Sequence, residues 1–356
     1  MVTNYGSIGG ETMIRGYVGT YTNGDSQGIY SFELDPSVGK ITDVKAVAML
    51  DNPTYLNITE NHRFLYSVIK SNEEGGVAGF SIDQHSGKLE RINMDMEVGS
   101  PPCHVSLDEK RGLVFSANYH KGTVVSYRIN QENGRISSPV SVVKHEGSGP
   151  DPRQEKAHTH FATMTPDQDY LVVCELGCDL LFTYEVKDNG ELKEVHRLSV
   201  PAGSGPRHLV FHPRDPSVAY LVTEFSSEVI VLSYAGGKFA EVQHLSAVPE
   251  DFAENNQASA IHISSDGRFV YAGNRGHNSI AIFSVEEQTG NLQLVERVAT
   301  EGDWPRDFVL DPAEKFLVAS NQNSSSLVLF ARDAETGMLT LLQKDIEVPN
   351  PVCVKF

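Results

Sequence analysis

Short apolar runs alternate with polar turns along the whole chain, and one segment of this kind recurs seven times. The copies begin at Thr54, Cys103, His160, Arg207, Ser259, Arg306 and Val352. Successive starts lie 49, 57, 47, 52, 47 and 46 residues apart. A period in this range is typical of repeat architectures, and short strands separated by turn signals make each repeat a small antiparallel sheet. The pattern predicts an all-β fold, a seven-bladed β-propeller with four-stranded antiparallel blades.

The two ends of the chain supply complementary parts of one repeat. The N-terminal stretches RGYVGTYT and GIYSFELD fit a second and a third strand, and the C-terminal PNPVCVKF fits a lone first strand. We therefore expect the N- and C-terminal strands to close the last blade together, which removes an exposed sheet edge. Residues 13–356 would then form a single propeller domain, with residues 1–12 as a flexible N-terminal extension.

Composition limits the class of protein. The 356 residues carry 47 acidic and 29 basic side chains, a net charge of -18, which opposes nucleic-acid binding because phosphates need a basic face. No apolar run approaches the ~20 residues of a spanning helix, and residues 1–12 do not resemble a secretory signal. The four cysteines are too few for a disulfide framework, so we expect reduced thiols in a cytoplasmic protein. Composition does not fix the oligomeric state.

Four polar residues fall at corresponding positions of consecutive repeats. In an antiparallel blade the start of the first strand and the end of the second lie on the same rim. This rule brings His160, Arg207, Glu224 and Arg275 to one arc of that rim. A base, an acid and two guanidiniums can activate water and stabilise an oxyanion, or bind a phosphate. The alternative interpretation is a structural salt-bridge network lining a solvated channel.

Other catalytic arrangements fit the sequence less well. His158 and His160 form a His-Thr-His on a strand, a spacing suited to a metal, but no third ligand is evident nearby. No Gly-x-Ser-x-Gly elbow is present for a nucleophilic serine. We therefore expect neither a metal site nor covalent serine catalysis.

Several of these segments together resemble a known family. The stretches RGYVGTYT, PCHVSLD, ANYHKGTVVSY, GPDPRQEKAHTHF, GSGPRHLVFHP, NRGHNSIA, WPRDFVLDP and PNPVCVKF are similar to the lactonase family of seven-bladed propellers, and within it to the bacterial 6-phosphogluconolactonase branch. The resemblance covers residues 13–356. Its most specific part is RQExxHxH followed by GPRHL, a glutamate and NRGH.

The resemblance implies hydrolysis of 6-phospho-D-glucono-1,5-lactone to 6-phosphogluconate, a step of the pentose phosphate route. The family's active cleft contains a His, an Arg, a Glu and a second Arg, which fall here on His160, Arg207, Glu224 and Arg275. Either Glu224 or His160 would be the base that takes a proton from water. Arg207 and Arg275 would bind the phosphate or the developing oxyanion. The partner would be a small anionic sugar lactone, with no metal or organic cofactor.

Further residues are weaker candidates for the same pocket. Arg153, Gln154 and Arg306 would line its outer part, and His158 is a further candidate for substrate binding. The stretch CELGCD, with Glu175, stands where family members often have Asp-Leu-Gly-x-Asp. Glu175 is therefore either a supporting carboxylate of the site or one that fixes the blade.

Two other functions remain compatible with the sequence. A propeller of the same family that cyclises a carboxymuconate would use the same base and arginines on a different anion. A non-enzymatic interaction scaffold is the second alternative, since propellers commonly bind partners on a rim and a fold does not fix a function. An activity assay separates the enzymes from the scaffold.

Overall fold

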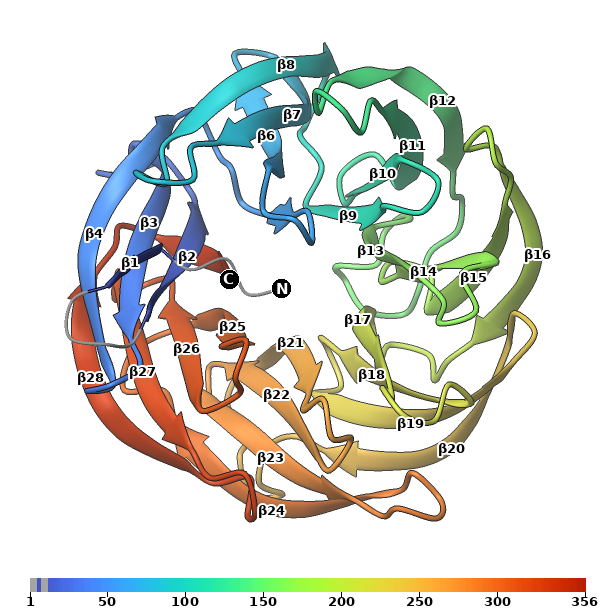
Figure 1. Cartoon of the computed structure of the whole chain (residues 1–356). Helices are drawn as coiled ribbons and strands as arrows, with labels where there is room; N and C mark the ends of the chain where they lie inside the picture. Colours follow the sequence, from blue (N-terminus) through green and yellow to red (C-terminus); the bar gives the residue numbers. More distant parts are fainter. Residues whose placement is uncertain (1–4, 8–11) are drawn as a thin grey trace. The chain divides into compact units, whose positions relative to one another are not determined.

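The computed structural model describes residues 5–7 and 12–356, and every regular element in them is a β-strand (Figure 1). The strands form seven antiparallel sheets. The chain divides into two compact units, which are described separately. The first unit comprises Met1–Pro101, Ile129–Ile136 and Thr300–Phe356, and the second comprises Pro102–Arg128 and Ser137–Ala299.

The first unit holds three of the sheets. One sheet joins both ends of the chain: β1 (Tyr5–Ser7), β2 (Thr12–Thr20), β3 (Gly28–Asp35), β4 (Lys40–Met49) and β29 (Pro351–Lys355). The next is built from β5 (Leu56–Ile58), β6 (Phe64–Ser71), β7 (Glu74–Ile82) and β8 (Leu89–Val98). The third consists of β25 (Pro305–Leu310), β26 (Phe316–Asn321), β27 (Ser326–Arg332) and β28 (Leu339–Glu347).

The second unit is built around the other four sheets. They are β9 (His104–Asp108), β10 (Leu113–Asn118), β11 (Thr123–Ile129) and β12 (Ile136–Lys144); β13 (Thr159–Met164), β14 (Tyr170–Glu175), β15 (Leu180–Val186) and β16 (Leu192–Ser199); β17 (Pro206–Phe211), β18 (Val218–Thr223), β19 (Glu228–Ala235) and β20 (Lys238–Ser246); and β21 (Gln257–Ile263), β22 (Phe269–Arg275), β23 (Ser279–Val285) and β24 (Leu292–Ala299). In each sheet the strands follow one another in chain order. This is the four-stranded meander that the repeat predicted.

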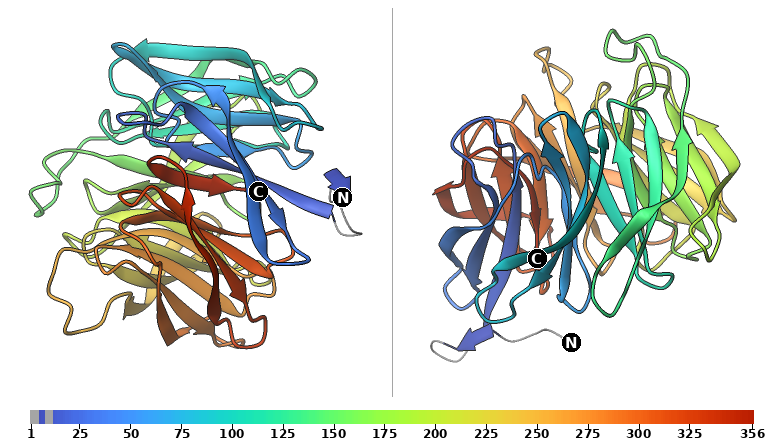
Figure 2. Two further views of the ribbon diagram at one scale, coloured as in Figure 1. Left: turned by 90° about the vertical axis from the view of Figure 1, so that its left-hand side faces the viewer. Right: turned by 90° about the horizontal axis from the view of Figure 1, so that it is seen from above.

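The two ends of the chain share one blade, as the sequence predicted. Strand β29 pairs antiparallel with β2, and Val18 lies opposite Val354 in the ladder. In Figure 1 the C-terminus lies beside β2, and Figure 2 shows the antiparallel, twisted sheets from two further sides. Strand β1 pairs with β2 as an additional strand. The expected flexible extension over residues 1–12 otherwise falls largely on residues 1–4 and 8–11, which lie outside the described part of the chain.

The core of the second unit lies between neighbouring blades. Side chains from β18 and β19 pack against side chains from β22 and β23 in one apolar cluster, whose members include Tyr220, Val231, Val270 and Phe283. The third strands β15 and β19 are largely buried because the blade of each lies between two other blades of this unit. This burial explains why those strands read as nearly continuous apolar runs.

Several of the first strands carry an irregularity that the sequence period does not reveal. In β13, Thr159 pairs with Glu175 and Phe161 with Cys174, so His160 is an extra residue in the ladder. Similar shifts fall at Arg207 in β17 and at Arg306 in β25. A β-bulge of this kind leaves the extra residue unpaired and re-aims its side chain. The repeat starts in these three strands therefore mark bulges, whereas the first strands β5 and β9 pair in continuous register.

Two further observations concern the cysteines and the potential for membrane-spanning helices. All four cysteines are free thiols, in agreement with the prediction of no disulfide framework. In the described part of the chain, no helix has the length and apolar character needed to cross a membrane.

Candidate active site

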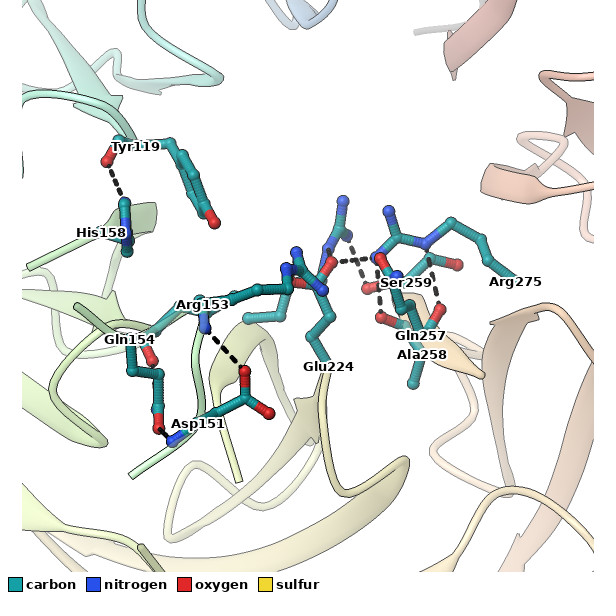
Figure 3. A network of polar contacts seen from close by, with 12 residues as sticks. Tyr119, Asp151, Arg153, Gln154, His158, Glu224, Gln257, Ala258, Ser259 and Arg275 are labelled. Atoms are coloured by element: carbon teal, nitrogen blue, oxygen red, sulfur yellow. Dashed lines mark hydrogen bonds and ion pairs between the residues drawn. The ribbon is translucent and has the colours of Figure 1, made fainter. Parts of the chain in front are cut away.

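Three guanidinium groups surround the carboxylate of Glu224 in the second unit (Figure 3). The Nη2 atom of Arg275 donates a hydrogen bond to Oε1 of Glu224. Arg207 Nε lies 3.7 Å from the same oxygen, and Arg153 Nη2 donates to Oε2 at 3.2 Å. Glu224 is 3 % exposed, so its carboxylate is nearly buried.

Backbone bonds fix Glu224 beside Arg207. The Glu224 amide donates to the carbonyl of Gly205 at 2.7 Å, which continues the pairing of β18 and β17 by one step beyond β18. Arg207 is the bulge residue on the adjoining strand, and its Nη1 donates to the carbonyl of Ser259 at 2.7 Å. The site therefore connects the blade of β17–β20 with the blade of β21–β24.

Arg275 is held in the same way by the first strand of its own blade. It ends β22, and its Nε donates to the carbonyl of Gln257 at 3.0 Å. Its Nη2 also donates to the carbonyl of Ala258 at 3.2 Å. A register shift between Ala258 and Ile261 disrupts the ladder at this point, where the neighbouring Ser259 carbonyl accepts its bond from Arg207.

The electrostatics of the cluster determine the state of Glu224. Burial by itself raises the pKa of this carboxyl, but Coulomb attraction by Arg275, Arg207 and Arg153, with the hydrogen bond from Arg275, outweighs burial and lowers the pKa below its ordinary value. Glu224 is therefore ionised at neutral pH and is a weak proton acceptor. Its carboxylate balances only one of the three guanidinium charges.

Tyr119 links His160 to the arginine cluster. The ring of His160, which is 5 % exposed, lies 6.1 Å from the ring of Tyr119 in an edge-on arrangement. The Tyr119 hydroxyl interacts with Arg153, although burial is the larger effect and raises the pKa of the phenol. Arg153 in turn binds Glu224. The four residues selected by blade register thus lie in one unit, together with Arg153 and Tyr119.

His158 is held in place by its own hydrogen bonds. Its Nδ1 lies 2.7 Å from the Tyr119 carbonyl oxygen, its Nε2 lies 3.0 Å from Oε1 of Glu155, and its ring stacks on Tyr119 at 4.1 Å. Both ring nitrogens therefore face oxygen acceptors. Within residues 5–7 and 12–356, no group of three or more His, Cys, Asp or Glu side chains has an arrangement that could hold a metal ion.

Glu175 lies in a buried hydrogen-bond network beneath this part of the site. Its carboxylate accepts bonds from Thr159 Oγ1 at 2.6 Å and from the backbone amide of His158. His145 Nδ1 lies 2.7 Å from Oε2 of Glu175, and its Nε2 lies 2.7 Å from the hydroxyl of Tyr184. Of the two roles expected for Glu175, these contacts favour the one that fixes the blade and orients the strand carrying His160.

Gln154 and Asp179 join the loop that carries Arg153 to the loop that precedes Arg207. The amide of Gln154, which is fully buried, donates to the Leu176 carbonyl and to Oδ1 of Asp179, both at 2.8 Å. Asp179 also accepts bonds from the backbone amides of Gly203 and Gly205. These contacts suit a positioning role for Gln154, and its contact with substrate stays a prediction. Sequence reasoning missed Asp179, although it is the final residue of the CELGCD motif.

Arg306 belongs to the first unit. It is the bulge residue of β25, and its guanidinium lies over the ring of Tyr21 at 5.2 Å. Its expected place in the outer pocket stays a prediction.

Replacing Asp179 by asparagine should lower kcat/KM by about 10-fold and the free energy of unfolding by about 1–3 kcal/mol, because an amide NH₂ would face buried N–H donors. Steady-state rates and chemical denaturation measure the two effects. Asp311→Asn is the matched control: Asp311 is also buried and accepts bonds from two backbone amides, but in the first unit. It should lose similar stability with little change in rate. Equal kcat/KM for the two variants would contradict the positioning role.

Comparisons with known proteins agree with this architecture. Residues 15–356 match the family model described as lactonase, 7-bladed beta-propeller. The 6-phosphogluconolactonase of Bacillus subtilis (strain 168) is 53% identical over 347 residues, which cover 97% of this chain and 99% of the relative. A crystal structure from Lactobacillus plantarum has a TM-score of 0.93 at 43% identity, and a periplasmic gluconolactonase from Pseudomonas aeruginosa has 0.92 at 32%. Each comparison covers 97% of this chain and 99% of the known structure.

Proposed function

The chain belongs to the lactonase family of seven-bladed β-propellers, and on that premise we propose that it hydrolyses 6-phospho-D-glucono-1,5-lactone to 6-phosphogluconate. The name of the Bacillus subtilis relative supports this substrate, and the name of the Pseudomonas aeruginosa structure supports sugar lactones more broadly. The protein is accordingly a lactone hydrolase of the pentose phosphate pathway.

The observation that carries the proposal is the charge of the Glu224 cluster. Three guanidiniums and one carboxylate give 3 − 1 = +2 within a chain of net charge -18. A phosphate monoester carries a charge of about −1.5 to −2 at pH 7, so it would nearly neutralise this excess. An uncharged lactone would leave the excess uncompensated. The cluster is therefore suited to an anionic sugar lactone.

The reaction needs an activated water and a stabilised oxyanion. We assign the base to His160, because the lowered pKa of Glu224 makes that carboxylate a weak proton acceptor. His160 takes a proton from water as the water oxygen bonds to C1 of the lactone. Arg207 and Arg275, held by backbone carbonyls, are preorganised donors for the oxygen that becomes negative.

Ring opening completes the reaction. When the tetrahedral intermediate collapses, the bond between C1 and the ring oxygen breaks, and the proton on His160 passes to the departing ring oxygen. The products are the carboxylic acid and the free hydroxyl, and the acid then ionises. In this scheme Glu224 does not exchange protons, and its charge keeps the arginines oriented.

The direct test is hydrolysis of a panel of lactones, corrected for the spontaneous rate. The panel contains 6-phospho-D-glucono-1,5-lactone, unphosphorylated glucono-1,5-lactone and a carboxymuconate lactone. We expect the highest kcat/KM for the phosphorylated sugar lactone. Rates no higher than the spontaneous ones for both sugar lactones would refute the proposal.

Exhaustive chelation should leave turnover unchanged, because the proposed chemistry uses a histidine and arginines only. The rate is measured before and after dialysis against a chelator, with added Zn²⁺ and Mg²⁺ as separate arms. Loss of activity on chelation with recovery on adding a divalent ion would require a metal bound near His158 and His160.

We expect the protein to act in the cytoplasm. The free thiols of all four cysteines suit a reducing compartment, where phosphorylated sugars are also metabolised.

A further inference from the structure

The three arginines around Glu224 are not equivalent. Arg207 and Arg275 are 2 % and 4 % exposed, and each donates to backbone carbonyls of β21. The side chain of Arg153 is 43% exposed, and among the described residues its guanidinium donates to no backbone carbonyl. Two of the guanidiniums are thus built into the blades, and the third is held only by other side chains.

The contacts of Arg153 allow its guanidinium to exchange one acidic partner for another. Its guanidinium lies 4.6 Å from the centroid of the Phe225 ring, contacts Tyr119, and pairs with Oε2 of Glu224. Arg275 and Arg207 lie instead at Oε1. An incoming anion can therefore replace Glu224 as the partner of Arg153 without releasing either buried arginine. A guanidinium has five N–H donors, so donors remain for a second acceptor.

The backbone beneath Arg153 is well fixed although its side chain is exposed. Asp151 to Gln154 form a tight turn, in which the Gln154 amide donates to the Asp151 carbonyl at 2.8 Å and the Arg153 amide donates to Oδ1 of Asp151 at 2.8 Å. The buried Gln154 side chain then anchors this turn to Asp179. The turn holds the exposed guanidinium at the edge of the charge cluster (Figure 3).

We infer that Arg153 is the residue that selects phosphorylated substrates: its guanidinium leaves Oε2 of Glu224 and binds the phosphate of the sugar lactone, with Tyr119 and Phe225 guiding the exchange. This inference rests on the proposed lactonase function. Arg207 and Arg275 keep their contacts with Glu224 and donate to the oxygen of the reacting carbonyl. A planar guanidinium matches two phosphate oxygens at once, which a lysine does not.

Arg153→Met tests the inference through substrate preference. For 6-phospho-D-glucono-1,5-lactone kcat/KM should fall by about 10-fold to 100-fold, the range for a lost charge-assisted contact, mostly through KM. For unphosphorylated glucono-1,5-lactone the decrease should stay below about 3-fold. Arg153→Lys should recover part of the loss, since it keeps the charge without the planar fork. Arg197→Met is the matched control, because Arg197 also pairs with a glutamate and lies over a phenylalanine ring at 4.9 Å.

Two results would overturn the assignment. An equal decrease in kcat/KM for both lactones would mean that Arg153 serves every substrate rather than phosphorylated ones. No decrease for either lactone would mean that Arg153 does not bind the phosphate.

Calorimetric binding of 6-phosphogluconate and gluconate to wild type and Arg153→Met gives a readout independent of turnover. If wild type hydrolysed neither lactone, the proposed function would fail. Equal 6-phosphogluconate affinity in both proteins would then reject the role of Arg153 separately.

Discussion

Replacing Glu224 by glutamine should lower kcat/KM for the phosphorylated lactone by about 10²–10⁴-fold. The substitution keeps the shape of the side chain but leaves three guanidiniums without a counter-charge, and the new NH₂ group would face a guanidinium donor. Removing one partner of a buried ion pair typically costs about 3–5 kcal/mol, most of it from the charge left behind. The arginines would repel one another and lose the geometry needed for the oxyanion. Steady-state kinetics and thermal unfolding separate the loss of rate from the loss of stability.

A matched control shows whether the loss of rate is specific to Glu224. Glu33→Gln removes a paired carboxylate in the first unit, where Arg15 lies 2.7 Å away, and should leave kcat unchanged.

The pH profile separates Glu224 from His160 as the base. Because the pKa of Glu224 is lowered, this group stays ionised well below neutral pH. A decline in kcat/KM between about pH 7 and pH 5 would therefore come from an imidazole, whose ordinary pKa is about 6.5. That decline should disappear in His160→Asn.

Wild-type rates in a folded Glu224→Gln/His160→Asn variant would reject both assignments, because the charge balance and the proposed base would be absent together. Wild-type rates in Glu224→Gln alone would reject the role of the charge cluster and leave His160 as the base.

Deleting residues 349–356 should abolish cooperative folding or lower Tm by more than about 10 °C. The deletion removes β29, in which Val352, Cys353 and Val354 are nearly or fully buried. Burial of an aliphatic side chain contributes about 1.5–3 kcal/mol, and a whole domain is stable by only about 5–15 kcal/mol. The loss would also expose the edge of β2 that pairs with β29. Circular dichroism during thermal unfolding measures the change.

Truncation of residues 1–10 is the control for this deletion. It removes the three-residue strand β1 and leaves the pairing of β2 with β29 intact. The truncated protein should melt within about 3 °C of the full chain. Equal melting temperatures for the full chain and the C-terminal deletion would contradict the stabilising role of β29.

The fold could be predicted because its signals are local and repeated. Each blade repeats an apolar first strand, a polar turn and a second strand, so one alignment located the sheets. The shared terminal blade followed from two strands at one end of the chain and a single strand at the other. Antiparallel pairing also predicts that His160, Arg207, Glu224 and Arg275 share one rim. The contacts of Glu224 bring Arg207 and Arg275 together, as that rule predicts.

The rest of the candidate site has no periodic signal. Arg153 reaches Glu224 from a long connection between β12 and β13, and its position depends on the turn at Asp151 and the buried amide of Gln154. Asp179 acts through three hydrogen bonds to two different loops, which no spacing in the sequence reveals. Irregular segments of this kind are positioned by tertiary contacts alone, so sequence patterns could name their residues but not their partners.

Side chains at the bulges of the first strands can change without altering the strand pairing of the fold. His160, Arg207 and Arg306 are extra residues in their ladders, so no residue on the adjoining strand depends on them for register. Val352 occupies the same position in β29. Evolution can therefore exchange the side chain at such a position while the blade around it stays the same. One scaffold of this kind can diversify its substrates by point mutation, and the bulge positions of the second unit, His160 and Arg207, are where a designer would begin to redirect it.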